Sequence, residues 1–304
     1  METPLISRRS FAATLVFTVC SPALAWARTA QKPAWSPERL ASLTRALTTL
    51  ESVSGGRLGV ALLDTASGQV ADYRGDERFL MLSSFKTLAA AYILARADRG
   101  QEQLTRRIPI TEADLLDYAP VTRRHVGPQG MTLAQLCEAT ITTSDNTAAN
   151  LMLRSFGGPQ ALTQFIRSLG DTVTRHDRYE PDLNRPHASE PLDTTSPNAM
   201  CRTLNELLFG QTLKPASRQL LQSWLLANTT GDKRLRAGIP ETWRAGEKTG
   251  TAAEVGANDA GFVQAPDRTP IVVSVYLETT DIPGPERERV IAQVGRYVAM
   301  LGER

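Results

Sequence analysis

The sequence predicts an α+β fold, in which an antiparallel sheet is flanked by the two terminal helices and lies beside an all-helical subdomain. Three observations predict it. An amphipathic helical pattern occurs near each end of the chain, strand patterns lie just inside both helices, and the long middle segment is mostly helical. A chain of 304 residues is long enough for one large domain, or two interlocked ones, with an ample apolar core.

The first predicted elements are a helix and a β-hairpin. Ser36, Pro37 and Glu38 are typical of a helix start, because serine caps free N–H groups, proline suits the first turn, and an acid favours the positive end of the helix dipole. Leucines then recur at helical spacing at positions 40, 43, 47 and 50. Residues 57–64 and 69–74 read as strands, and the turn sequence between them predicts a hairpin.

The middle of the chain and its C-terminal part complete the predicted layout. From residue 83 to about residue 224 the pattern is mostly helical and is broken by glycine and proline loops. Strand patterns return at 244–251, 260–264 and 271–278, and a last amphipathic helix follows at 285–301. We therefore predict an α/β part formed by residues of about 28–75 and 226–304, with a helical part of about 76–225 inserted between them.

The first 27 residues are predicted to be a signal peptide. Arg8 and Arg9 precede an apolar run over residues 11–19, and Ala25-Trp26-Ala27 offers small residues at the positions that a signal peptidase reads. The paired arginines indicate twin-arginine export, and the alternative is an ordinary secretory signal. The apolar run is far shorter than the roughly 20 residues that span a bilayer. We expect a mature chain of residues 28–304, periplasmic or secreted, without stable membrane association.

Composition and charge exclude several classes of function. A net charge of +2 predicts no nucleic-acid partner. The three histidines are scattered, and the sequence has neither a His-Glu-x-x-His metal motif nor a Gly-x-x-x-x-Gly-Lys phosphate loop. We therefore predict no metal, and we also expect no cofactor and a monomeric protein. Cys137 and Cys201 remain after the signal is removed, and we predict that both are buried free thiols.

The most informative motif is Ser83-Ser84-Phe85-Lys86, which lies where an apolar helical run begins. A spacing of three places the Ser83 hydroxyl and the Lys86 amine on one helical face. A serine hydroxyl becomes a strong nucleophile when a neighbouring base takes its proton. A lysine with a lowered pKa can take that proton, or can help a carboxylate to take it, without any histidine.

Three further motifs follow in order along the chain. They are Ser144-Asp145-Asn146, Glu180-Pro181-Asp182-Leu183-Asn184 and Lys248-Thr249-Gly250. Only five lysines occur in the chain, and two of them, Lys86 and Lys248, fall within the four motifs. The set resembles that of the class A serine β-lactamases, whose signatures include Ser-x-x-Lys, Ser-Asp-Asn and Lys-Thr-Gly. The resemblance extends over roughly residues 36–302.

This resemblance implies a chemical role for several residues. The implied substrate is a β-lactam, a penicillin or cephalosporin, whose strained amide is attacked by Ser83. Either Lys86 or Glu180, acting through a water, takes the serine proton, and the sequence leaves this choice open. Ser144 passes a proton to the departing nitrogen. Glu180 and Asn184 then direct the water that releases the acyl group.

The resemblance also implies a set of substrate-binding residues. These are Asn146, Asn184, Lys248, Thr249, Gly250, Thr251, Arg234 and Tyr118. Lys248 and the neighbouring threonines are expected to bind the substrate carboxylate, and the N–H groups of Ser83 and Thr251 are expected to form an oxyanion hole. For Arg234 the alternative is a solvated basic cluster, and for Tyr118 it is an ordinary surface tyrosine.

The loop that carries Glu180 receives two further expectations. Arg178 and Asp193 bracket it and are expected to pair across its neck, and the resemblance suggests a cis bond between Glu180 and Pro181. This loop also separates the rival functions. A peptidoglycan DD-peptidase shares the other three motifs but lacks a deacylating loop. A sensor that is acylated and stays acylated is the second rival.

Overall fold

The computed structural model of the protein describes Met1 and residues 35–302. Residues 35–302 belong to one compact unit. Apart from Met1, the predicted signal peptide of residues 1–27 lies outside the described residues. Among the helices described, none combines the length and apolar character needed to cross a bilayer.

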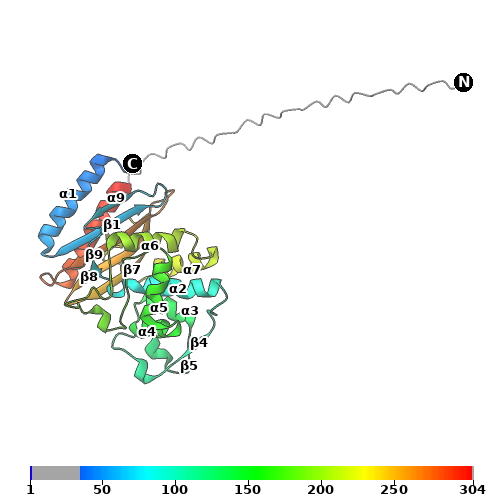
Figure 1. Ribbon diagram of the computed structural model, residues 1–304. Coiled ribbons are helices and arrows are strands. Elements are labelled where there is room, and N and C mark those ends of the chain that lie inside the picture. Colours follow the sequence, from blue (N-terminus) through cyan, green and yellow to red (C-terminus); the bar gives the residue numbers. More distant parts are fainter. Residues whose placement is uncertain (2–34, 303–304) are drawn as a thin grey trace. The chain divides into compact units, whose positions relative to one another are not determined.

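A five-stranded antiparallel sheet organises the α/β part, in the order β2-β1-β9-β8-β7 (Figure 1). Its strands are β1 (Arg57–Asp64), β2 (Val70–Tyr73), β7 (Arg244–Ala252), β8 (Gly256–Gln264) and β9 (Ile271–Glu278). The predicted strands are confirmed. β8 begins at Gly256 rather than at residue 260, because small and polar residues with no strand pattern of their own pair with the end of β7 across a tight turn.

The two terminal helices pack against each other on one face of this sheet (Figure 1). They are α1 (Pro37–Ser54) and α9 (Gly284–Gly302). Ser36 caps α1 as predicted, and its side chain accepts from the Arg39 N–H. The core under this face consists of apolar side chains from both helices and the sheet, such as Leu47, Leu58, Val60, Val275, Ile291 and Val298.

The other face of the sheet is covered by the helical part of the chain. Its helices are α2 (Phe85–Asp98), α3 (Leu133–Thr142), α4 (Asn146–Ser155), α5 (Gly158–Ser168), α6 (Pro197–Phe209) and α7 (Pro215–Leu226), whereas the short α8 (Leu235–Gly238) packs against α9. α6 contacts β1 and β9, and α7 contacts β7. α2 is buried along nearly its whole length, which matches its largely apolar sequence.

The helical part is not entirely helical, in contrast to the predicted all-helical subdomain. Two small antiparallel sheets lie in it, β3 (Phe79–Leu80) with β6 (Thr194–Thr195), and β4 (Arg107–Ile110) with β5 (Gly127–Thr132). β4 alternates exposed and less exposed positions but has only four residues, one of them a proline, and β5 has no alternating pattern. Tertiary contacts therefore decide these strands, and local sequence does not.

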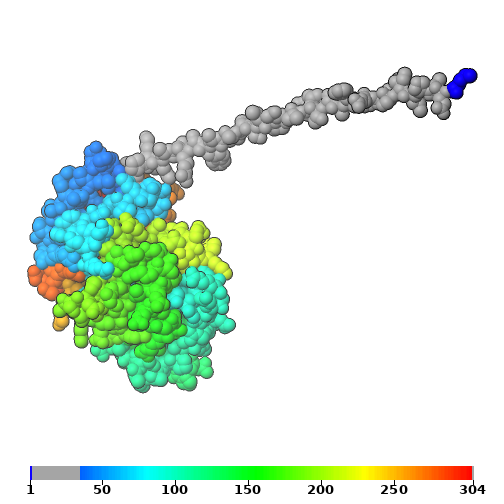
Figure 2. All heavy atoms as spheres, in the orientation of Figure 1, coloured from blue at the N-terminus to red at the C-terminus, as the bar shows by residue number. Residues whose placement is uncertain are grey.

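The colours of Figure 2 follow the same division of the described chain. Residues from both ends of this unit, in blue and in orange, share one region of the visible surface, and mid-chain residues in green cover another. The helical insertion therefore meets the sheet along a boundary that segments far apart in the sequence share. Groups from both parts can meet only at such a boundary, so it is the natural place for a site.

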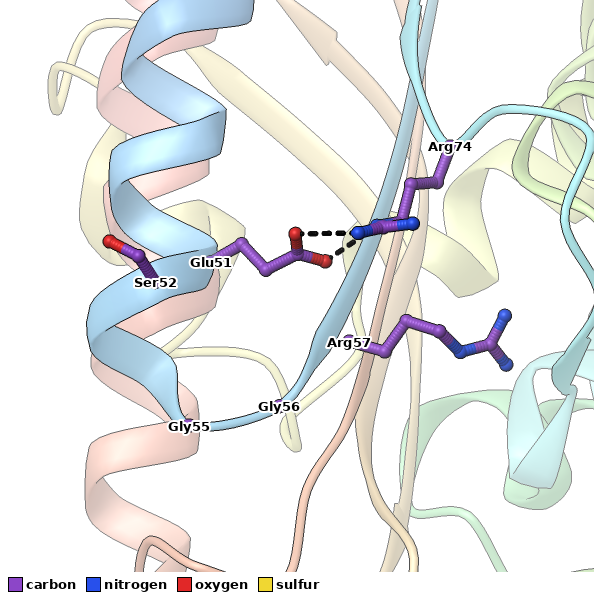
Figure 3. Close-up of a pocket in the computed structure, with 6 residues that line it drawn as sticks. All are labelled: Glu51, Ser52, Gly55, Gly56, Arg57 and Arg74. Atoms are coloured by element: carbon purple, nitrogen blue, oxygen red, sulfur yellow. Dashed lines mark hydrogen bonds and ion pairs between the residues drawn. The ribbon is translucent and has the colours of Figure 1, made fainter.

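A shallow hollow of about 470 Å³ lies where α1 ends and β1 begins (Figure 3). Glu51 points across it to Arg74, whose Nε lies 2.7 Å from Glu51 Oε1. Glu51 also accepts from the Leu58 N–H at 2.9 Å. The ion pair fastens the end of α1 to the hairpin of β1 and β2. Because its two charges neutralise each other, the ion pair has a structural role and leaves no free charge in the hollow.

A close helix crossing fixes α9 against the segment that follows residue 234. A Cβ atom at Gly238 would lie 1.9 Å from the Ala292 carbonyl oxygen, and one at Gly295 would lie 2.5 Å from the Leu235 carbonyl oxygen. Real Cβ atoms do not approach backbone so closely. The two glycines therefore allow α8 and α9 to pack backbone to backbone.

We expect Gly238→Ala to lower the thermal midpoint by about 3–10 °C, because the added methyl group must push α9 away and overpacking costs roughly 1–3 kcal/mol. Gly284→Ala is the matched control, since a Cβ there would meet nothing within 4 Å. Thermal unfolding followed by circular dichroism measures both. Equal midpoints for the two variants would contradict the close-packing argument.

Candidate active site

A cavity of about 420 Å³ lies between the two parts of the fold. It is lined by Ser83, Tyr118, Ser144, Asn146, Glu180, Asn184, Thr230, Arg234, Thr249, Thr251 and Glu288. The structure thus brings together most of the residues predicted from the sequence. Lys86 and Lys248 are fully buried beside it, and both contact Ser144. Thr230 and Glu288 were not predicted.

Two strained backbone positions place the serines of this site. Ser83 lies in a 3₁₀ turn (Leu82–Ser84) that leads into α2, and Leu82 before it has a φ of 47°. Ser144 itself, between α3 and α4, has a φ of 62°. A non-glycine residue in this region costs about 1–3 kcal/mol and persists where surrounding contacts hold it. Such strain is typical of functional sites.

Ser83 and Lys86 converge on one carboxylate oxygen. Ser83 Oγ donates to Glu180 Oε1 at 3.4 Å, and Lys86 Nζ lies 3.2 Å from the same atom. Glu180 Oε2 accepts from Asn184 Nδ2 at 2.6 Å. The side chains of Lys86 and Glu180 are both inaccessible to solvent, so they form a buried ion pair in which each charge compensates the other.

Ser144 lies between the two buried lysines. Lys86 Nζ donates to Ser144 Oγ at 3.2 Å, and Lys248 Nζ donates to it at 3.0 Å. Lys86 also donates to Asn146 Oδ1 at 2.5 Å and to the Ser144 carbonyl oxygen at 2.9 Å. A hydroxyl that accepts from ammonium groups keeps its own proton for another acceptor. Ser144 can therefore pass a proton on toward the cavity.

The electrostatics of the site lower the pKa of both lysines. Burial is the main cause for Lys86, and the charge of Glu180 opposes it. Burial also lowers the pKa of Lys248 well below its ordinary value, and the positive charges of Lys86 and Arg234 add to the effect. Two amines that release protons more readily than usual, on either side of one hydroxyl, favour proton transfer through that hydroxyl.

Asp145 has a structural role. It caps α4 by accepting from the Ala148 N–H at 2.8 Å, and it accepts from the N–H groups of Val121 and Thr122 at 3.0 and 2.9 Å. The Tyr118 carbonyl oxygen in turn accepts from the Asn146 N–H at 3.0 Å. These bonds fix the loop that brings the half-exposed Tyr118 ring to the cavity wall.

The loop over residues 178–193 is closed at its neck as predicted. Arg178 Nε donates to Asp193 Oδ2 at 2.6 Å, and the Arg178 N–H donates to Asp193 Oδ1 at 3.0 Å. The Glu180–Pro181 bond is cis. Asn150 in α4 holds the backbone of Glu180 from beneath, accepting from its N–H at 3.0 Å and donating to its carbonyl oxygen at 2.9 Å.

Arg234 is buried and is not part of a solvated basic cluster. It donates to the carbonyl oxygens of Gly250 and Asn258 at 2.8 and 2.7 Å, and to Thr251 Oγ1 at 2.6 Å. Its side chain therefore braces the end of β7 that borders the cavity. A Cβ at Gly250 would lie 2.3 Å from Asn258 Oδ1, so glycine is needed here for packing as well as for approach to a ligand.

Thr230 sets the orientation of the Thr249 hydroxyl. Asn228 Oδ1 accepts from both the N–H of Thr230, at 3.0 Å, and its hydroxyl, at 2.8 Å. The single hydroxyl proton of Thr230 is thus used, and the 2.5 Å contact between the Thr230 and Thr249 hydroxyls must be donated by Thr249. A ligand that accepts from Thr249 has to compete with Thr230.

Sequence reasoning missed Asn150, Thr230 and Glu288. Asn150 had a detectable signal, since it is a lone amide in the otherwise apolar run of residues 148–153. Thr230 and Glu288 lie in no motif, and only the tertiary fold brings them to the cavity. Across the residues that the structure describes, no cluster of three or more histidine, cysteine or acidic side chains could hold a metal ion.

Comparison with known proteins agrees with this geometry. The model of the β-lactamase enzyme family matches residues 42–300. β-Lactamase L2 of Stenotrophomonas maltophilia is 46% identical over 304 residues, which cover 98% of this chain and 99% of that protein. An ancestral class A β-lactamase of known structure is 58% identical, with a TM-score of 0.83, and the match covers 85% of this chain and 99% of that one. The chain belongs to the class A β-lactamase family.

Further relatives extend the likeness within the class A β-lactamases. A β-lactamase of Streptomyces albus G is 46% identical over 260 residues, covering 84% of this chain and 83% of that protein. The structure of a putative class A β-lactamase from Rhodopseudomonas palustris is 52% identical, with a TM-score of 0.83 and coverage of 85% and 99%. These matches cover nearly whole chains, so both parts of the fold belong to the family.

His176 lies fully buried under the loop of this β-lactamase, stacked on Phe85 with 4.1 Å between ring centroids. Burial lowers the pKa of His176 to about 4, although the nearby carboxylates of Asp193 and Glu180 oppose the shift. The unfolded chain, where histidine has a pKa of about 6.5, takes up the proton first. The folded state therefore loses stability as the pH falls from about 6.5 toward 4.

We expect the free energy of unfolding to decrease by roughly 2–3 kcal/mol from this group between neutral pH and pH of about 4. His176→Leu, which keeps an apolar side chain against Phe85, should flatten this dependence. His125→Leu, at an exposed histidine, is the control. Urea unfolding at several pH values measures all three proteins. A wild-type slope retained in His176→Leu would contradict the assignment.

Proposed function

We propose that this class A β-lactamase hydrolyses the ring amide of penicillins and cephalosporins through an acyl-enzyme on Ser83, and so confers β-lactam resistance. The observation that carries the proposal is the convergence of Ser83 Oγ and Lys86 Nζ on Glu180 Oε1, while Asn184 holds the other oxygen of that carboxylate. A nucleophile, a base and a means of positioning water thus lie within one cavity.

Acylation begins when Ser83 Oγ attacks the lactam carbonyl carbon. We assign the proton of Ser83 to Glu180, because Ser83 already donates to it and Lys86 directs its own protons to oxygens of Ser144, Asn146 and Glu180. The negative oxygen of the tetrahedral intermediate is stabilised by the N–H groups of Ser83 and Thr251, and such a donor is typically worth about 3–4 kcal/mol. The C–N bond then breaks as Ser144 gives its proton to the nitrogen. Ser144 regains a proton from Lys86, which takes up the proton that Glu180 received from Ser83, so that Glu180 is again a carboxylate.

Deacylation uses the same carboxylate with a water molecule. Glu180 takes a proton from the water while the water oxygen attacks the ester carbonyl carbon. Asn184 orients the water. The ester bond to Ser83 breaks, Glu180 returns the proton to Ser83 Oγ, and the ring-opened acid leaves. The loop that places Glu180 and Asn184 is what separates this reading from the DD-peptidase and sensor alternatives.

The carboxylate of the substrate fits the end of the cavity formed by β7. Thr249, Thr251 and Arg234 line it, and Lys248 lies behind with its positive charge. Asn146 and Tyr118 also line the cavity, and we assign Asn146 to the amide of the substrate side chain and Tyr118 to the cavity wall. These groups explain recognition of an anionic bicyclic substrate by charge and by hydrogen bonds.

The cellular setting is also a proposal. The paired Arg8 and Arg9 and the small residues before residue 28 support export of a mature chain of residues 28–304 by the twin-arginine route, with an ordinary secretory signal as the alternative. We propose a periplasmic or secreted monomer without stable membrane association and without a nucleic-acid partner. Cleavage of the signal in cells that lack twin-arginine transport would contradict the first export route.

The decisive experiment is steady-state hydrolysis of a chromogenic cephalosporin and of benzylpenicillin by the mature protein, with mass spectrometry of the same mixtures. Turnover with little adduct supports a β-lactamase. A stable adduct without turnover would support the sensor or penicillin-binding alternatives, and would mean that Glu180 does not direct water as proposed.

We expect Glu180→Ala to lower kcat by roughly 10²–10⁴-fold and to accumulate an acyl adduct on Ser83. Loss of the Glu180 charge lowers the pKa of Lys86 further, so that Lys86 can take the Ser83 proton, while deacylation has no other base. Ser83→Ala should form no adduct. Asp182→Ala is the matched control, since Asp182 is an exposed acid in the same loop. Rapid-quench mass spectrometry checks all three. If Glu180→Ala protein stays unmodified and keeps the wild-type kcat, Glu180 is not the base of deacylation.

A further inference from the structure

Glu288 is a carboxylate at the cavity to which the proposed reaction assigns no role. It lies on α9, belongs to no motif, and lines the same cavity as Arg234 and Thr251. The structure gives it neither a hydrogen bond nor a salt bridge within 4 Å among the residues described. Its neighbour Glu286, in contrast, pairs with Arg289 at 3.4 Å. Glu288 is therefore a negative charge at the cavity without a fixed cationic partner.

The position of Glu288 is fixed by the residues around it. Arg287 is buried and donates to the carbonyl oxygens of Ile282, Ala252 and Ala253 at 2.9, 3.3 and 3.0 Å. These bonds tie the first turn of α9 to the end of β7. The close crossing at Gly238, a few residues beyond Arg234, holds the rest of α9. Glu288 is thus carried by a helix, α9, that is held in place beside the cavity.

The charges at this end of the cavity set what Glu288 can do. Burial lowers the pKa of Arg234, and the negative charges of Asp259 and Glu288 oppose that effect, which places Glu288 within electrostatic reach of Arg234. Arg234 already donates to Gly250, Asn258 and Thr251, so its hydrogen bonds are directed at β7 and β8. The field of Glu288 is therefore available to a bound molecule.

The chemistry of cephalosporins puts a second group beside their carboxylate. The carboxylate and the variable ring substituent of a cephalosporin are attached to adjacent ring atoms. When the carboxylate binds at Thr249 and Thr251, the adjacent substituent is therefore placed at the same end of the cavity, near Glu288. A positive substituent is attracted to Glu288 there, and a neutral one is not.

We propose that Glu288 is a specificity-determining residue that favours cephalosporins with a cationic substituent next to the carboxylate. The proposal rests on the proposed hydrolysis of cephalosporins and names a substrate class within it. A positive substituent keeps the carboxylate in its own site and adds an ion pair with Glu288 at the partly exposed rim. Because both charges are close to solvent, the attraction is moderate and sensitive to salt.

The test uses two cephalosporins that share a thienylacetamido side chain, one with a pyridiniomethyl and one with an acetoxymethyl group next to the carboxylate. We expect Glu288→Gln to lower the ratio of their kcat/KM values, cationic over neutral, by about 3–10-fold. Glu286→Gln, on the same helix but outside the cavity, should leave the ratio unchanged. Added salt should lower the ratio of the wild type and should hardly change that of Glu288→Gln.

Each outcome has one meaning. A ratio that stays at the wild-type value in Glu288→Gln overturns the proposal, and so does an equal loss for both substrates, which would indicate a structural role through Arg234. If Glu288→Gln does not fold, the test is the salt dependence of the kcat/KM ratio, cationic over neutral, in the wild type. A wild-type ratio that does not change with salt overturns the proposal. No hydrolysis of either compound by the wild type would instead refute the proposed β-lactamase function.

Discussion

The site depends on two ammonium groups that are buried around one hydroxyl. Removing Lys86 and Lys248 from water is expensive unless nearby oxygens and carboxylates compensate, and the structure supplies Ser144 and Glu180 for this purpose. The same arrangement lowers the pKa of both lysines. The energetic cost of burying these charges and their chemical usefulness therefore have one cause, and any change that admits water to the lysines weakens both effects.

Rigid surroundings are what make this charge arrangement possible. Leu82 and Ser144 have positive φ angles that unsupported chains avoid. The buried α2, the capped start of α4 and the Asn150 side chain hold the turn, the loop and Glu180 in place. None of these supports touches a ligand. Their hydrogen bonds and apolar packing offset the strain, and the result is a preorganised site.

The sequence predicts those parts of the fold and of the site that depend on residues close together in the chain. The cap at Ser36, the strands of the central sheet and the spacing from Ser83 to Lys86 could be predicted, because each depends on residues close in the chain. The two small sheets, Thr230 and Glu288 could not, since they owe their places to contacts between distant segments. For Gly250 the sequence predicted only a role in substrate binding, because its packing against Asn258 is invisible without the fold.

The layer behind the cavity and its rim have different electrostatic roles. Behind it, burial raises the pKa of Glu247 and of Asp259 while it lowers that of Lys248, so the charges in this layer depend on one another. A substitution there alters the protonation of its neighbours and with it the reaction. At the rim, Glu288 is partly exposed and water screens its field, so it acts on a bound substrate without setting the charge of the buried lysines. Substrate preference can therefore change at the rim while the buried chemistry stays the same.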